Sequence, residues 1–139
     1  MATIVLEIPL KIGAEQAWAL VSDYGAPHRL APGFVADCRL EGEDRIVTFA
    51  NGPTVRERLV TLDRQGRRLV YTSVGGRAEH HNAVIEVLDQ ASGSVIRWTT
   101  DVLPHTLGPT IYSMMERGAA AIGSERPDAS GVASAMSAA

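Results

Sequence analysis

The sequence has one cysteine, few aromatic residues, no long apolar run and little net charge, and each shortage excludes a class of protein. The single cysteine, Cys38, excludes an internal disulfide and fits a reducing compartment. No apolar stretch approaches the ~20 residues of a membrane-spanning helix, and the first residues lack the pattern of a signal peptide. A net charge of -3 gives no bulk electrostatic reason to bind nucleic acid. We therefore expect a cytoplasmic protein with no membrane span and no nucleic-acid partner.

The composition that remains is that of one soluble globular domain. Hydrophobic residues make up 45% of the 139 residues and charged residues 21%, so the chain can bury a core without disulfides. Aromatic residues make up only 5%, while alanine and glycine are abundant. A curved sheet with so few large side chains does not fill its own interior, which hints at a cavity.

Hydrophobic periodicity predicts one strand, two short helices, six further strands and a long last helix. The predicted strands are 3–10, 34–41, 44–50, 54–63, 67–75, 79–89 and 94–103, and the short helices are 13–25 and 26–32. Apolar residues recur at helical spacing over 107–123, and only this helix is long enough to cover an antiparallel sheet. We expect residues 1–123 to form the ligand-binding domain and 124–139 to form a flexible, Ala/Ser-rich tail.

Four stretches of the chain, together with this element order, resemble a known superfamily. The stretches are AWALVSDYGAPHRLAP, RIVTFANGPTVRERLVTLD, RLVYTSVGG and VIRWTTDVLP. They resemble the polyketide cyclase/dehydrase-like group of the START and birch-pollen-allergen (SRPBCC) superfamily. The resemblance implies an α+β helix-grip fold, in which a curved seven-stranded antiparallel sheet wraps around a long C-terminal helix. It also implies a cavity for a hydrophobic ligand, in a superfamily that ranges from cyclases and dehydrases to non-enzymatic carriers.

The predicted strand 54–63, TVRERLVTLD, carries a carboxylate on its apolar side. Strict alternation puts Val55, Glu57 and Leu59 on one face and Leu62 on the other, with the arginines. Glu57 therefore points where the core residues point. We predict that it is a pocket carboxylate, available to a polar group on an otherwise apolar ligand.

Loop lengths predict which side chains surround this carboxylate. A three-residue loop over 51–53 puts Val47 opposite Glu57. Arg45 then lies diagonal to Glu57, within reach of a long side chain. In an empty pocket, Arg45 would hold the carboxylate.

The following two loops extend the pattern across two more strands. The first puts Leu59 opposite Tyr71, and therefore Glu57 opposite Ser73. The second puts Ser73 opposite His81. Since neighbouring strands lie about 4.8 Å apart, the row Glu57, Ser73 and His81 could converge on one ligand group.

The candidate site residues share the inward face of the sheet or the apolar stripe of the last helix. The candidate catalytic residues are Glu57, His81 and Tyr71. The candidate ligand-binding residues are Arg45, Val47, Phe49, Leu59, Ser73, Ile85, Trp98, Thr100 and Met115.

Each candidate also has a purely structural interpretation. Glu57 either serves as a base, with its pKa raised by a dry pocket, or forms a structural ion pair with Arg45. His81 is as readily a hydrogen-bonded core histidine as a functional one. Tyr71 and Trp98 fit core packing better than ligand stacking.

Neighbouring histidines do not indicate a metal site. His80 and His81 are consecutive on a strand and point to opposite faces, so they cannot bind one ion together. No other ligand spacing is present. We expect neither a metal nor a cofactor.

Three functions remain open. The first is an enzyme that catalyses cyclisation, dehydration or isomerisation of a small carbonyl compound. The second is a non-catalytic carrier or sensor of a lipid-like ligand. The third is an interaction module that uses a basic patch on the outer face. The residues of that patch are Arg56, Arg58, Arg64, Arg67 and Arg68. We favour binding of a small hydrophobic or amphipathic ligand in an internal cavity, with catalysis as an option, by a monomer or homodimer.

Overall fold

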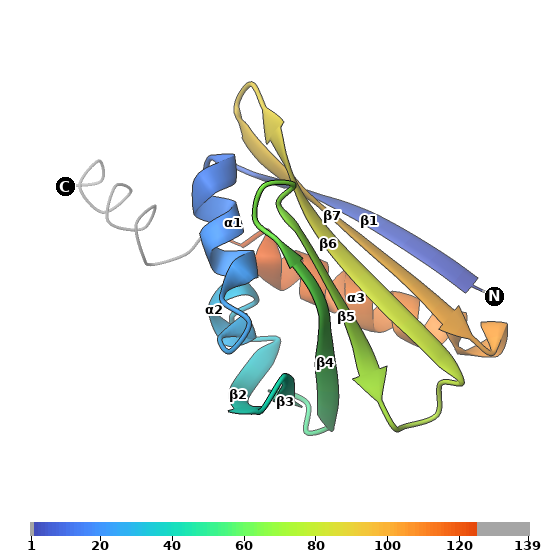
Figure 1. The fold of residues 1–139 in the computed structure, drawn as a ribbon. Coiled ribbons are helices and arrows are strands. Elements are labelled where there is room, and N and C mark those ends of the chain that lie inside the picture. Colours follow the sequence, from blue (N-terminus) through green and yellow to red (C-terminus); the bar gives the residue numbers. More distant parts are fainter. Residues whose placement is uncertain (1, 125–139) are drawn as a thin grey trace.

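The computed structural model describes residues 2–124 and confirms the helix-grip fold (Figure 1). The strands are β1 (Ala2–Leu10), β2 (Val35–Glu41), β3 (Asp44–Phe49), β4 (Thr54–Asp63), β5 (Arg68–Val74), β6 (His80–Gln90) and β7 (Gly93–Leu103). The helices are α1 (Ala14–Ser22), α2 (Pro27–Leu30), the 3-10 turn η1 (His105–Leu107) and α3 (Gly108–Ile122). The tail predicted at 124–139 falls outside the described residues, apart from Ser124.

The seven strands form one antiparallel sheet in the order β1-β7-β6-β5-β4-β3-β2. Helix α3 runs along the concave side of this sheet, and α1 and α2 lie together at one end (Figure 1). Every predicted strand is present, with bounds that differ by a few residues at most. None of the described helices is long and apolar enough to cross a membrane.

Helix α3 packs closely on the sheet because its inward stripe is buried and contains a glycine. Met115, Gly118 and Ile122 are buried on this stripe. A side chain at Gly118 would place its Cβ only 2.9 Å from the ring of Trp98 and 3.1 Å from that of Phe34. The absence of a side chain at Gly118 therefore brings the helix axis close to Trp98.

Two of the predicted hairpin registers are confirmed. On β4 and β5, Glu57 lies opposite Ser73 and Leu59 lies opposite Tyr71. On β5 and β6, Tyr71 lies opposite Ala83, which is the register that puts Ser73 opposite His81. The predicted alternation of these strands therefore placed the right residues together.

The predicted register of β3 and β4 is wrong by two residues. Val47 lies opposite Val55, and Arg45 lies directly opposite Glu57 rather than diagonal to it. The three-residue loop lies one position earlier than predicted, over 50–52 rather than 51–53, because the N–H of Phe49 donates to the carbonyl of Pro53. A shift of two residues keeps every side chain on its face, so alternation could not detect the error.

A β-bulge changes the second half of β4. The pairing shifts between Leu59 and Thr61, which leaves Val60 as the extra residue, 55% exposed. Leu62 therefore lies opposite Leu69 and packs against the core, whereas strict alternation predicted that it would face outward. A bulge inserts one residue and so reverses the faces that follow it.

Candidate ligand-binding site

A small cavity of about 60 Å³ lies between α3, the α2 region and the sheet. Most of its wall is apolar, and its polar side chains are Arg45, Glu57 and Tyr71. The apolar wall comprises Pro27, Leu30, Ala31, Phe34, Val35, Val47, Phe49, Ile85, Trp98, Met114, Gly118 and Ile122. We call this space the inner cavity.

The polar part of the inner cavity is a buried ion pair between adjacent strands. The Nε of Arg45 donates to Oε1 of Glu57 over 2.9 Å, and the two side chains are only 7% and 11% exposed. A second Arg45 nitrogen donates to the carbonyl of Tyr24 over 3.1 Å, and the Tyr24 hydroxyl donates to the carbonyl of Glu57. The pair is thus tied to the loop after α1.

Two tyrosine rings enclose the Arg45 guanidinium. Its central carbon lies 4.2 Å from the centroid of the Tyr24 ring and 5.0 Å from that of Tyr71, distances at which cation–π attraction operates. Burial alone lowers the pKa of Arg45, but the charge of Glu57 and the two tyrosines outweigh it and the pKa is raised. Arg45 is therefore a fixed cation.

Tyr71 presents a neutral hydroxyl beside this ion pair. Burial raises the pKa of Tyr71, and the negative charge of Glu57 raises it further. Its hydroxyl oxygen accepts a hydrogen bond from Nε1 of Trp98 over 3.2 Å. A phenol that stays protonated can also donate a hydrogen bond, as a ligand carbonyl requires.

A second hollow of about 240 Å³ lies where the end of β5 meets the start of α3. Its wall comprises Thr54, Val55, Arg56, Ser73, Val74, Gly75, Gly76, Arg77, Ala78, His81, Leu107, Thr110 and Ile111. We call this space the outer hollow. It carries the other two members of the predicted polar row, Ser73 and His81.

His81 is held as a hydrogen-bond acceptor in the outer hollow. Its Nδ1 accepts from the backbone N–H of Ser73 over 3.0 Å. Burial lowers the pKa of His81, and the neighbouring His80 lowers it further. The ring centroid of His81 lies 6.2 Å from that of Tyr71, which borders the inner cavity.

The predicted row therefore shares one face of the sheet but is divided between two spaces. Glu57 borders the inner cavity with Arg45, while Ser73 and His81 border the outer hollow. Five other candidates line the inner cavity: Val47, Phe49, Tyr71, Ile85 and Trp98. These positions leave the roles proposed for the side chains as predictions.

Three candidates line neither space. Leu59 packs against the core, and Thr100 is 2% exposed. Met115, predicted to line the cavity, is completely buried, and its neighbour Met114 reaches the cavity instead. One position along a helix turns a side chain by about 100°, so the apolar stripe was too wide to choose between the two methionines.

Sequence reasoning missed the wall that comes from the α2 region. Neither Tyr24 nor the residues from Pro27 to Val35 are among the candidate site residues. Their apolar character and the short helix closed by Pro32 were visible in the sequence. No local pattern shows that this segment folds over the sheet. Within residues 2–124, no group of three His, Cys, Asp or Glu side chains could hold a metal ion.

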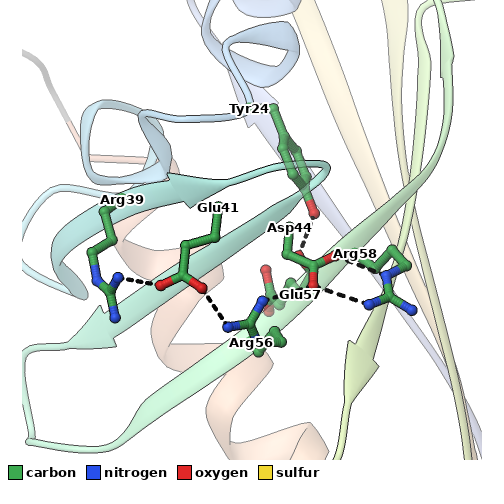
Figure 2. A network of polar contacts seen from close by, with 7 residues as sticks. All are labelled: Tyr24, Arg39, Glu41, Asp44, Arg56, Glu57 and Arg58. Atoms are coloured by element: carbon green, nitrogen blue, oxygen red, sulfur yellow. Dashed lines mark hydrogen bonds and ion pairs between the residues drawn. The ribbon is translucent and has the colours of Figure 1, made fainter.

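The predicted basic patch on the convex face is largely neutralised by acidic partners. Arg56 bonds to both Glu41 and Asp44, and Arg58 also bonds to Asp44. Arg39 bonds to Glu41 and completes a chain of five charges, which we call the convex ladder (Figure 2). Arg67, another patch member, pairs with Glu15 and Asp89. A partner would meet alternating charges here rather than a field of cations.

The strands of this sheet and the helix they enclose define a member of the SRPBCC helix-grip superfamily. Residues 1–126 match the family model described as polyketide cyclase / dehydrase and lipid transport. The chain belongs to that family. No curated protein sequence matches it significantly.

Solved structures with the same fold come from bacteria and plants. The protein XoxI from Bacillus cereus is 18% identical, with a TM-score of 0.77 over 88% of this chain and 94% of that one. A solution structure from Thermobifida fusca is 30% identical, with a TM-score of 0.71 over 88% of each chain. Norcoclaurine synthase from Thalictrum flavum is 22% identical, with a TM-score of 0.68 over 88% of this chain and 84% of that one.

Proposed function

We propose that this protein binds a small amphipathic molecule between α3 and the concave face of the sheet. The apolar body of the ligand would pack against Val47, Ile85 and Trp98. Its polar group would meet the Arg45–Glu57 pair. The observation that carries the proposal is this buried ion pair in the wall of an otherwise apolar cavity.

The free-energy cost of burying two charges is the reason for giving the Arg45–Glu57 pair a role in binding. Removing two charges from water is expensive, and replacing a buried ion pair with well-packed hydrophobic residues is often neutral or stabilising. The fold therefore does not need these charges at this position for stability. A ligand with a polar end gives them a second use, because it can accept from Arg45 or donate to Glu57.

The size of the inner cavity restricts the ligand and requires the wall to move. About 60 Å³ holds only a few waters, while ligand pockets are typically hundreds of Å³. Met114 lines the wall, and its flexible thioether side chain can adopt other rotamers. We propose that Met114 makes way for the ligand, which could extend toward the outer hollow.

The relatives support a ligand of modest size. A norcoclaurine synthase structure holds dopamine and hydroxybenzaldehyde, and that protein has the same fold with a TM-score of 0.61. Both molecules have an aromatic body and polar substituents. Ligands of this class match the apolar wall and the polar residues of the inner cavity.

Catalysis is the second candidate function, and the proximity of Tyr71 to His81 favours it. A neutral phenol can polarise a carbonyl, and a neutral imidazole can take a proton from the adjacent carbon. Such a pair would serve cyclisation or dehydration. Glu57 is held by the charged Arg45, whereas His81 accepts only from the neutral N–H of Ser73. We therefore assign the base to His81, which would take the proton on Nδ1 as it releases Ser73.

Binding can be tested with N-phenyl-1-naphthylamine, a neutral apolar probe that becomes fluorescent in a dry site. We expect saturable binding by the wild type and at least a tenfold weaker affinity in Ile85→Trp, which fills the inner cavity. Val60→Trp adds the same ring at an exposed strand position and serves as the matched control. Equal affinity in the two variants, with both shown to be folded by circular dichroism, would place the probe elsewhere and contradict the proposal.

The polar half of the proposal needs a different ligand series. Matched aromatic compounds with and without a carbonyl should differ in affinity for the wild type. That difference should disappear in Arg45→Met/Glu57→Leu, which removes both charges. If the double variant keeps the preference, the ion pair is structural only. Turnover of a bound carbonyl compound that survives His81→Asn would exclude His81 as the base.

A further inference from the structure

Strands β5 and β6 part before β5 ends. Their backbone pairing runs from Arg68 opposite Glu86 to Tyr71 opposite Ala83 and stops there. Strand β5 continues to Val74, and β6 stays paired with β7 back to His80. Figure 1 shows the two strands separating toward the loop that joins them. The sheet is therefore split over the last residues of β5.

Two hydrogen bonds to His81, each between a side chain and the backbone, hold the separated ends of β5 and β6 together. The backbone N–H of Ser73 donates to the Nδ1 of His81, and the hydroxyl of Thr72 donates to the carbonyl of His81. The first of these bonds depends on the protonation state of the ring. A backbone N–H can only donate, so it needs an Nδ1 that carries no proton.

We infer that His81 is a proton-sensitive latch, whose neutral ring holds the end of β5 to β6 and whose protonated ring releases it. An imidazolium has a proton on each nitrogen and cannot accept from Ser73. Two half-buried donors would then face each other, and the end of β5 would move away. The outer hollow, which both residues line, would widen toward solvent.

The chain after β5 is built to allow this movement. Gly75 and Gly76 follow directly and have φ angles of +78° and +79°. In this conformation a glycine carries no steric penalty, and it can change its backbone angles more freely than other residues. The released segment thus has a flexible joint at its end.

Burial and the adjacent His80 of β6 favour the neutral His81 ring at neutral pH. Arg77 of the β5–β6 loop lines the same hollow, while the guanidinium of Arg56 is bonded to Glu41 and Asp44 on the convex face. Tyr71 of β5 faces the ring but stays uncharged.

The neighbours on the elements packed against His81 are uncharged or already paired. Strand β7 presents Val102 opposite His81, and α3 and the turn before it present Leu107, Thr110 and Ile111. Glu57, opposite Ser73 on β4, is already paired with Arg45. The lowered pKa of His81 agrees with this arrangement, so the latch opens only as the pH falls below the ordinary histidine value of about 6.5.

Amide hydrogen exchange at Ser73 tests the latch without any ligand, and so independently of the proposed binding function. We expect its protection factor to fall at least tenfold as the His81 ring titrates, followed in the same samples by NMR. Amides of β6 that pair with β7 should keep their protection. Unchanged protection at Ser73 through the titration, or a ring that stays neutral down to pH 4.5, would overturn the inference.

Two matched variants sharpen the test. His81→Phe keeps a ring but has no acceptor, so Ser73 should be unprotected at every pH. His80→Phe makes the same change on the opposite face, and its Ser73 should still respond to pH as in the wild type. Full protection of Ser73 in His81→Phe would also overturn the inference. If His81→Phe does not fold, the wild-type titration alone decides.

Discussion

Two systems of ion pairs lie on opposite faces of β3 and β4. They are the Arg45–Glu57 pair on the concave face and the convex ladder on the other, and they differ in how far water reaches the arginines. Arg56, Glu57 and Arg58 are consecutive on β4. Glu57 points inward to Arg45 and is almost fully buried, while the two arginines point outward and share Asp44. Figure 2 shows the outward set as the convex ladder, with Glu57 behind it. The exposure of the arginines separates the two systems: the side chain of Arg45 is 7% exposed, whereas those of Arg56 and Arg58 are 37% and 53% exposed around a buried Asp44.

The two systems differ in whether water can take the place of a charged partner that has been removed. On the convex face, loss of Asp44 would leave Arg56 and Arg58, whose side chains are 37% and 53% exposed. Water can solvate these charges, so such pairs contribute little. In the inner cavity, an Arg45 without Glu57 would keep only the carbonyl of Tyr24, two tyrosine rings and apolar neighbours. The two systems should therefore respond very differently to the same type of substitution.

The largest effect should follow removal of the buried carboxylate charge. Glu57→Gln leaves Arg45 buried and without a counter-ion, which costs about 3–5 kcal/mol in other proteins. We expect a loss of this order in the free energy of unfolding, measured by urea denaturation. A loss no greater than that of Asp44→Asn on the convex face would remove the contrast between the two systems.

The double variant Arg45→Met/Glu57→Leu is the control for this prediction. It removes both charges and supplies apolar volume, so most of the lost stability should return. If it is as unstable as Glu57→Gln alone, the pair stabilises the fold by a net attraction and not merely by mutual neutralisation.

A smaller effect should follow loss of the hydroxyl beside the ion pair. Tyr71→Phe removes the acceptor for Nε1 of Trp98 and should cost about 1 kcal/mol, the usual net value of one hydrogen bond. The late component of the absorbance change of tyrosine ionisation at high pH should also shrink without disappearing, because burial raises the pKa of both Tyr71 and Tyr24. A wild-type protein in which every tyrosine ionises near pH 10 would contradict this assignment.

The smallest effect should come from the convex ladder, and salt and pH should reveal it. Hydrogen bonds from Arg58 and Arg56 lower the pKa of Asp44 to about 2. Its stabilising contribution is therefore complete above the unfolded value of ~3.9 and is lost as the pH falls through about 2. The destabilisation by Asp44→Asn should shrink in 1 M NaCl, whereas that of Glu57→Gln should not. Equal salt dependence would show that the two environments are alike.

Alternation along strands predicted which face each side chain occupies, and most of the site follows from that. Glu57, Tyr71 and Trp98 were assigned to the inward face because each lies in step with apolar neighbours. The opposition of Glu57 to Ser73 required only the loop between β4 and β5 to be read correctly. Periodicity is a local property, and it survives in the structure wherever the strand is regular.

The errors arise where the strand is irregular or the contact is distant. The bulge at Val60 moved Leu62 inward, and a turn one residue earlier than predicted brought Arg45 directly opposite Glu57. The division of the polar row between two spaces depends on where α3 and the α2 region pack. Contacts between segments so far apart in the chain leave no mark in the spacing of either one.

The shape of the inner cavity depends on the missing side chain at Gly118. The helix rests on Trp98 and Phe34 where a side chain is missing, and one added methyl would meet the Trp98 ring at 2.9 Å. Such a methyl would act as a spacer that lifts α3 from the sheet or turns the indole aside. Because Gly118 and Trp98 both line the inner cavity, we expect Gly118→Ala to change its shape.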